Sequence, residues 1–189
     1  MTGINELPAT TRARLISAAG VVIILLSAGA ALLPVAEGAP GTLIGALLMV
    51  AGLLETGAAL MRKDGRPLAL VVGGVTVLAG LLFLINRTTQ FFPMINLVAG
   101  WLLLRSVALL IAALRADASV KTWLGISAAT DFLLGLLLVA GLSIAGLVVS
   151  VFGPTPQLIA SFSWVFALSF IVTGALLLEV ASCEREAGR

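Results

Sequence analysis

Apolar segments of membrane-spanning length fill most of this chain. A helix needs about 20 residues to cross the hydrocarbon core of a bilayer. Soluble domains carry about 25% charged residues, whereas this chain of 189 residues has 11% charged and 60% hydrophobic residues and a mean hydropathy of +1.19. The sequence therefore predicts an all-α membrane protein with six transmembrane helices. The expected spans are residues 15–33, 42–61, 68–85, 94–114, 123–142 and 158–180.

The fifth apolar run is longer than a bilayer requires. It continues from Trp123 to Phe152, with only small residues such as Gly141 and Ser143 to interrupt it. A straight helix of this length would measure about 45 Å, against a hydrocarbon core of about 30 Å. The helix either crosses at a strong tilt or bends near residues 141–143, and we favour the bend.

Polar residues flank the six-helix domain, which we place at residues 15–181. Residues 1–14 are polar and end in Arg12 and Arg14, and residues 182–189 form a polar tail. Basic residues before an apolar run are also typical of a signal peptide. This run is longer than the usual signal-peptide core, and further spans follow it, so we interpret it as an uncleaved first helix.

Lysine and arginine are distributed unevenly over the two sides of the predicted domain. Cytoplasmic loops of membrane proteins carry an excess of these residues. With six spans, the opposite loops hold only Arg87, and Arg105 lies within a span. We therefore expect both termini in the cytoplasm, on the side that holds the other nine. These are Arg12, Arg14, Arg62, Lys63, Arg66, Arg115, Lys121, Arg185 and Arg189.

A weak internal repeat has a period of about fifty residues, the length of one helical hairpin. Ala28-Gly29 in the first span matches Ala79-Gly80 in the third. Glu55 and Arg105 occupy equivalent places in successive hairpins, and Val172 occupies that place in the last span. The simplest description is three tandem helical hairpins.

Glu179 lies at the end of the last span, and three ionisable residues, Glu55, Arg105 and Asp131, lie well inside these apolar spans. A charge at the centre of a bilayer costs roughly 2.5–3.5 kcal/mol even on the lenient insertion scale, so these side chains are expected to face the protein interior. Their distances from the helix ends place all three in one half of the bilayer, where one arginine can pair with two carboxylates. Three roles remain open: fixing the helix register, forming a proton or solute pathway, or contacting another subunit.

Residue types on which many catalytic sites depend are absent or scarce in this chain. The chain has no histidine, one cysteine (Cys183) and one aspartate within a span (Asp131). Histidine is the commonest metal ligand and general base, an aspartyl protease site would need a second aspartate, and one cysteine cannot form an intramolecular disulfide. We predict no enzymatic activity, no metal and no cofactor.

The basic loop Arg62, Lys63 and Arg66 is predicted to contact anionic lipid headgroups. The chain has no basic patch of the kind that binds nucleic acid. Membrane lipids are therefore the expected partners, and both a homo-oligomer and a larger membrane complex remain open.

The pattern resembles the HdeD-like acid-resistance membrane proteins, which are small bacterial inner-membrane proteins built from short repeated helical hairpins. The resemblance extends over residues 15–181 and rests on the chain's size, its six spans and a few soft motifs. These motifs are Ala28-Gly29, Ala79-Gly80, Pro34, the run Gly100-Trp101-Leu102-Leu103-Leu104, and Thr173-Gly174-Ala175.

The resemblance implies a non-enzymatic role in surviving acid or related stress, in the bacterial inner (cytoplasmic) membrane, and it supplies no catalytic residues. Two other roles remain open. One is an accessory subunit of a larger membrane complex, which the short loops favour over a receptor. A small proton or solute carrier would use Glu55, Arg105 and Asp131, but polar residues are sparse in the spans.

Overall fold

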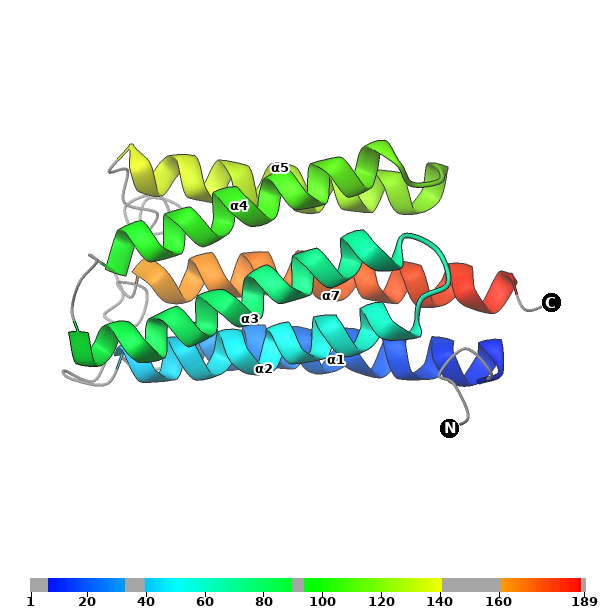
Figure 1. Ribbon diagram of the computed structural model, residues 1–189, viewed down its shortest axis with the longest axis horizontal. Helices are drawn as coiled ribbons and strands as arrows, with labels where there is room; N and C mark the ends of the chain where they lie inside the picture. The colour runs from blue at the N-terminus through cyan, green and yellow to red at the C-terminus, as the bar shows by residue number, and fades with distance from the viewer. Residues whose placement is uncertain (1–6, 33–39, 90–93, 141–160, 188–189) are drawn as a thin grey trace.

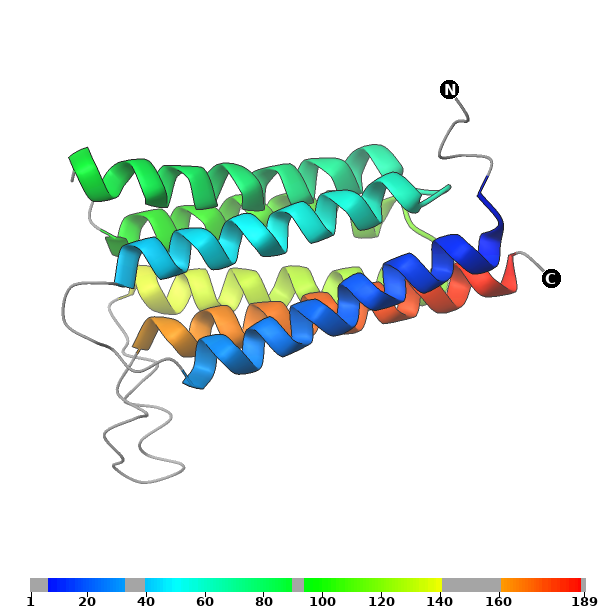
Figure 2. The same ribbon diagram turned by 90° about the horizontal axis from the view of Figure 1, so that it is seen from below.

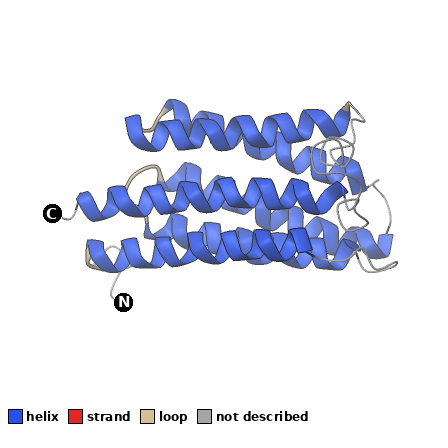
Figure 3. Ribbon diagram, turned by 180° about the vertical axis from the view of Figure 1, so that it is seen from behind, coloured by secondary structure: helices blue, strands red, loops and turns tan. Residues whose placement is uncertain are grey.

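The computed structural model describes residues 7–32, 40–89, 94–140 and 161–187, and these residues form a bundle of long helices (Figures 1 and 3). Six helices among them are long and apolar enough to cross a membrane, and the described ranges contain no strand. The predicted all-α class with six spans is therefore confirmed, and the chain is a multi-pass membrane protein. The helices are α1 (Ala9–Leu32), α2 (Pro40–Met61), α3 (Arg66–Thr89), α4 (Met94–Leu114), α5 (Ala118–Val139) and α7 (Ser161–Glu186).

Several helices extend past the expected spans. α1 begins at Ala9, where the Pro8 carbonyl accepts hydrogen bonds from the backbone of Thr11 and Arg12. α7 continues to Glu186, beyond the expected end at residue 180. These extensions contain charged residues, of which Arg12 and Glu184 pair with each other. The expected bend near residues 141–143 lies outside the described residues.

Both described chain ends lie at one end of the bundle, together with the turns at residues 62–65 and 115–117 (Figure 1). We call this the terminal end. Local sequence explains the first of these turns: Gly65 adopts a φ of +65°, which a residue with a side chain rarely does.

Eight of the nine basic residues that were expected on one side lie at or near the terminal end. They are Arg12, Arg14, Arg62, Lys63, Arg66, Arg115, Lys121 and Arg185.

The helices pack most closely as α2 with α3, α4 with α5, and α1 with α7 (Figure 2). The three expected hairpins, α1–α2, α3–α4 and α5–α7, also have their helices in contact, but less extensively. The closest packing is thus shifted by one helix relative to the sequence repeat. The pairing of α1 with α7 closes the bundle, because it joins the first described helix to the last.

Glycines explain why α2 and α3 approach so closely. A β-carbon on Gly52 would lie 2.6 Å from the Val77 nitrogen, and one on Gly80 would lie 2.7 Å from the Met49 nitrogen. Small residues let membrane helices bring their backbones together. Gly45 faces Leu84 and Gly80 of the same chain, so it contributes to packing within the monomer.

The outer surface of the bundle is apolar and the interior holds many of the polar side chains. Leu25, Leu53, Leu78 and Leu104 are exposed, as expected of side chains that face lipid. By contrast, Arg105 is 1% exposed and Asp131 is 1% exposed. The fold therefore brings the intramembrane charges to its centre.

Candidate functional site

Arg105 lies on α4 at the centre of the bundle and binds residues of three other helices. Its Nη2 donates to Glu55 Oε1 of α2 (2.8 Å) and to Thr173 Oγ1 of α7 (2.7 Å). Its Nη1 donates to Asp131 Oδ2 of α5 and to Ser169 Oγ of α7 (3.2 Å). The structure thus brings together Glu55, Arg105 and Asp131, which we call the central cluster.

Hydroxyl groups surround the carboxylates of the central cluster. Thr76 Oγ1 of α3 lies 3.1 Å from Glu55 Oε2, and Ser169 Oγ donates to Asp131 Oδ1 at 2.7 Å. Trp101 Nε1 lies 3.5 Å from Thr76 Oγ1. Both carboxylates are therefore hydrogen-bonded at both oxygens, as buried carboxylates must be.

Sequence reasoning missed Ser169 and Thr173 as partners of Arg105. They lie four residues apart on α7, so they share one face of the helix, and the Thr173 hydroxyl also donates to the Ser169 carbonyl at 2.7 Å. The repeat placed Val172 at this depth, whereas the neighbouring Thr173 reaches the guanidinium. Two hydroxyl residues at helical spacing in an apolar span were the available signal.

The central cluster contains one more negative group than positive groups. Two carboxylates face a single guanidinium, and all three side chains are at most 5% exposed. Burying an ion pair is costly unless its geometry and hydrogen bonds are good, and an extra buried charge raises that cost. Arg105 also keeps one N–H, at Nε, without a hydrogen-bond partner in the described part of the chain.

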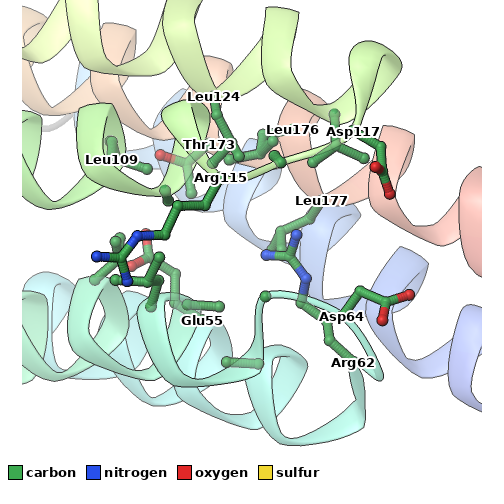
Figure 4. Close-up of a pocket in the computed structure, with 18 of the residues that line it drawn as sticks. Glu55, Arg62, Asp64, Leu109, Arg115, Asp117, Leu124, Thr173, Leu176 and Leu177 are labelled. Carbon is green, nitrogen blue, oxygen red and sulfur yellow. The ribbon is translucent and has the colours of Figure 1, made fainter.

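A cavity of about 130 Å³ leads from the terminal end to the central cluster (Figure 4). Glu55, Arg105 and Thr173 line its base. Its mouth lies at the two turns, where each turn contributes one arginine and one aspartate (Arg62, Asp64, Arg115 and Asp117). The walls between mouth and base are mostly apolar, with Leu68, Val72, Leu109, Leu124, Leu176 and Leu177 among them.

Aromatic side chains fill the interior on the other side of Arg105. Trp101 precedes Arg105 by about one turn of α4, and its ring stacks on Phe166 with 5.5 Å between ring centroids. Phe170 packs on both rings, at 6.4 Å from Trp101 and 6.3 Å from Phe166. The Arg105 guanidinium lies 5.9 Å from the Trp101 ring centroid. Because α4 and α7 both run towards the terminal end, Trp101 and Phe166 lie on the side away from the cavity mouth, whereas Phe170 lies between Ser169 and Thr173 on α7, at the depth of the central cluster.

A second polar network joins helices at the terminal end. Glu184 Oε2 pairs with Arg12 Nη2 at 2.9 Å, and Glu184 Oε1 accepts from the backbone nitrogen of Lys63 at 3.0 Å. Arg12 Nη1 also donates to the Leu7 carbonyl at 3.0 Å. This network, which we call the Glu184 network, connects α1, α7 and the α2–α3 turn. Sequence reasoning did not single out Glu184.

The three residues expected to contact lipid headgroups have different surroundings. The Lys63 side chain is exposed, whereas Arg62 and Arg66 are half-buried. Arg62 lines the cavity mouth, and burial lowers its pKa, an effect that the nearby carboxylates of Glu184 and Asp64 oppose. Headgroup contact therefore remains a prediction that suits Lys63 best.

Comparisons of the chain with protein-family models, with curated proteins and with solved structures find no match. The resemblance to the HdeD-like proteins thus rests on the sequence motifs alone. The cavity and the central cluster are the structural features that bear on function.

Proposed function

We propose that this chain is a non-enzymatic membrane protein that protects bacteria against acid or related stress, and that the central cluster is its proton-responsive element. One observation carries the proposal. A buried group of two carboxylates and one guanidinium lies at the base of a cavity that opens at one end of the bundle.

The charge of the central cluster gives it a reason to respond to protons. With both carboxylates ionised the cluster carries one net negative charge, and binding one proton makes it neutral. A low-dielectric interior penalises net charge strongly. The cavity offers protons a route to this site, since Glu55 and Arg105 line its base.

We place the protein in the bacterial inner membrane with the terminal end in the cytoplasm. The support is the concentration of lysine and arginine at that end, which is typical of cytoplasmic loops. In this orientation the cavity opens to the cytoplasm. The central cluster would then respond to acidification of the cell interior.

A one-sided response is favoured over a conducting pathway. Trp101 and Phe166 stack on the side of Arg105 away from the cavity, and Phe170 packs against both rings, so this group of rings opposes a continuous hydrated path. Apolar rings offer water and ions few hydrogen-bond partners. Among the described residues that line the cavity on the other side, the charged ones lie at its base and at its mouth.

Acid survival of a deletion strain tests the proposal. Survival should fall in the deletion strain and return with the wild-type gene. Glu55→Gln should fail to restore it, because an amide cannot take up the proton. Glu179→Gln is the matched control, since it makes the same chemical change at a residue of α7 that lies outside the central cluster. Normal acid survival of the deletion strain, or full rescue by Glu55→Gln, would contradict the proposal.

A further inference from the structure

The two carboxylates of the central cluster differ in their access to the cavity. Glu55 lines the cavity together with Arg105 and Thr173, whereas Asp131 and Ser169 are not among the residues that line it. Counted over the whole residue, Glu55 is 6% exposed and Asp131 is 1% exposed. A proton or water molecule that enters from the terminal end therefore reaches Glu55 before it reaches Asp131.

The Thr76 hydroxyl, which hydrogen-bonds to Glu55, can act as either the donor or the acceptor in that bond. Thr76 Oγ1 lies 3.1 Å from Glu55 Oε2 and 3.2 Å from the Val72 carbonyl oxygen. A hydroxyl has one proton to donate and two lone pairs that accept. If Glu55 is protonated, its own O–H can donate to Thr76, and Thr76 can donate to Val72. No polar group then loses its partner.

The partner of Asp131 has no such alternative. Ser169 Oγ donates to Asp131 Oδ1 at 2.7 Å and accepts from Arg105 Nη1 at 3.2 Å. Among the described residues, Asp131 is the one acceptor of the Ser169 hydroxyl. A proton on Asp131 Oδ1 would point at the hydroxyl proton of Ser169. Because that hydroxyl has no other acceptor among the described residues, a buried donor would be left unsatisfied.

Charged groups from the surrounding elements act on Glu55 in two sets. At the base, Arg105 favours its ionised form and Asp131 favours its protonated form. At the mouth, the two arginines and two aspartates balance in formal charge. α3 and α7 contribute the neutral hydroxyls of Thr76 and Thr173 at this depth. The charged groups concerned are Arg105, Asp131, Arg62, Asp64, Arg115 and Asp117.

From these observations we infer that Glu55 takes up the proton through the cavity, from the terminal end, while Asp131 stays ionised and paired with Arg105. This inference rests on the proposed function for its biological meaning. It divides the central cluster into a fixed ion pair, Arg105 with Asp131, and one exchangeable carboxyl group, Glu55.

Infrared spectroscopy of the full chain in lipid vesicles tests which carboxyl group is protonated. A carbonyl band of a neutral carboxylic acid should appear as the pH falls. Exposed carboxyl groups give bands that are common to all variants. One further band should shift when glutamate is labelled with ¹³C, disappear in Glu55→Gln and persist in the control Glu179→Gln. In Asp131→Asn it should need a proton concentration at least about tenfold higher, because Arg105 then pairs with Glu55 alone.

Two infrared results would overturn the inference. One is a band that does not shift with labelled glutamate and is lost in Asp131→Asn. The other is that wild type and Glu55→Gln give the same carboxylic-acid bands over the pH range in which the protein stays helical. Neither readout uses acid survival, so an incorrect proton acceptor and an incorrect stress function give separable failures.

Cysteine accessibility tests the route. In a Cys183→Ser background, Ala112→Cys places a thiol on the cavity wall, and Ala129→Cys places one on the exposed surface of α5. A charged, membrane-impermeant thiol reagent should modify Ala112→Cys at least about tenfold faster, and only from the side of the terminal end, because a thiolate forms readily only where water reaches it. Equal and slow reaction of both thiols would show that the cavity is not an aqueous route.

Discussion

The central cluster and the Glu184 network both bury an arginine against a glutamate, but they differ in charge balance. In the Glu184 network one guanidinium faces one carboxylate, whose other oxygen accepts a backbone N–H. In the central cluster one guanidinium faces two carboxylates, and a cavity reaches the site. A balanced pair connects helices without leaving a net charge, although Arg12 Nε, like Arg105 Nε, has no hydrogen-bond partner among the described residues. An unbalanced site at the base of a cavity can change its charge, and this is why we propose it as the functional element.

The largest effect is expected for Arg105→Leu. Removing the guanidinium leaves two buried carboxylates without a counter-charge, and breaking a buried pair from one side costs about 3–5 kcal/mol. Thermal unfolding in mild detergent, followed by circular dichroism, measures the loss. The triple variant Arg105→Leu, Glu55→Gln, Asp131→Asn should recover much of it, since no charge remains. A stability loss in Arg105→Leu no larger than that of Glu55→Gln would argue against a cluster centred on Arg105.

A smaller loss, about 1–3 kcal/mol, is expected for Glu184→Gln. Arg12 then loses its counter-charge, but it lies near the terminal end, where water can replace part of the interaction. Glu186→Gln provides the control, because Glu186 is exposed on the same helix. The same unfolding assay applies. If Glu184→Gln proves as damaging as Arg105→Leu, the two networks do not differ in the way we describe.

Glu55→Gln should change the stability by no more than about 1 kcal/mol. The amide oxygen can still accept from Arg105, and the cluster becomes neutral as it does on protonation. Glu55→Leu, which removes the acceptor altogether, should be clearly less stable than Glu55→Gln in the same assay. Equal losses in the two variants would mean that the hydrogen bond to Arg105 contributes nothing.

The smallest effect on stability is expected for Lys63→Ala, at most about 0.5 kcal/mol. Only the backbone nitrogen of Lys63 takes part in the Glu184 network, and the side chain is exposed. The same variant should weaken binding of anionic lipid by about 1 kcal/mol, which native mass spectrometry with phosphatidylglycerol can measure. Unchanged lipid binding would remove Lys63 from the expected headgroup contacts.

The sequence determined the class of the protein and the location of its charges. Six runs of about 20 apolar residues specify six helices. Lipid offers no hydrogen-bond partners to the backbone, and a helix satisfies all of its backbone groups within one segment. The same solvent forces Glu55, Arg105 and Asp131 inward, so their meeting could be anticipated. These are local properties, or consequences of the solvent, and they need no knowledge of which helix packs on which.

Tertiary structure alone decided the rest. Whether Thr173 or Val172 faces Arg105 depends on how far α7 is rotated, which its close packing on α1 through Gly20 and Gly174 helps to fix. Likewise, Arg12 and Glu184 stand at opposite ends of the chain and meet only because α1 and α7 pair. The difference between Glu55 and Asp131 has the same origin. Both are carboxylates in apolar spans, and only the packing of the helices places one of them at the base of a cavity.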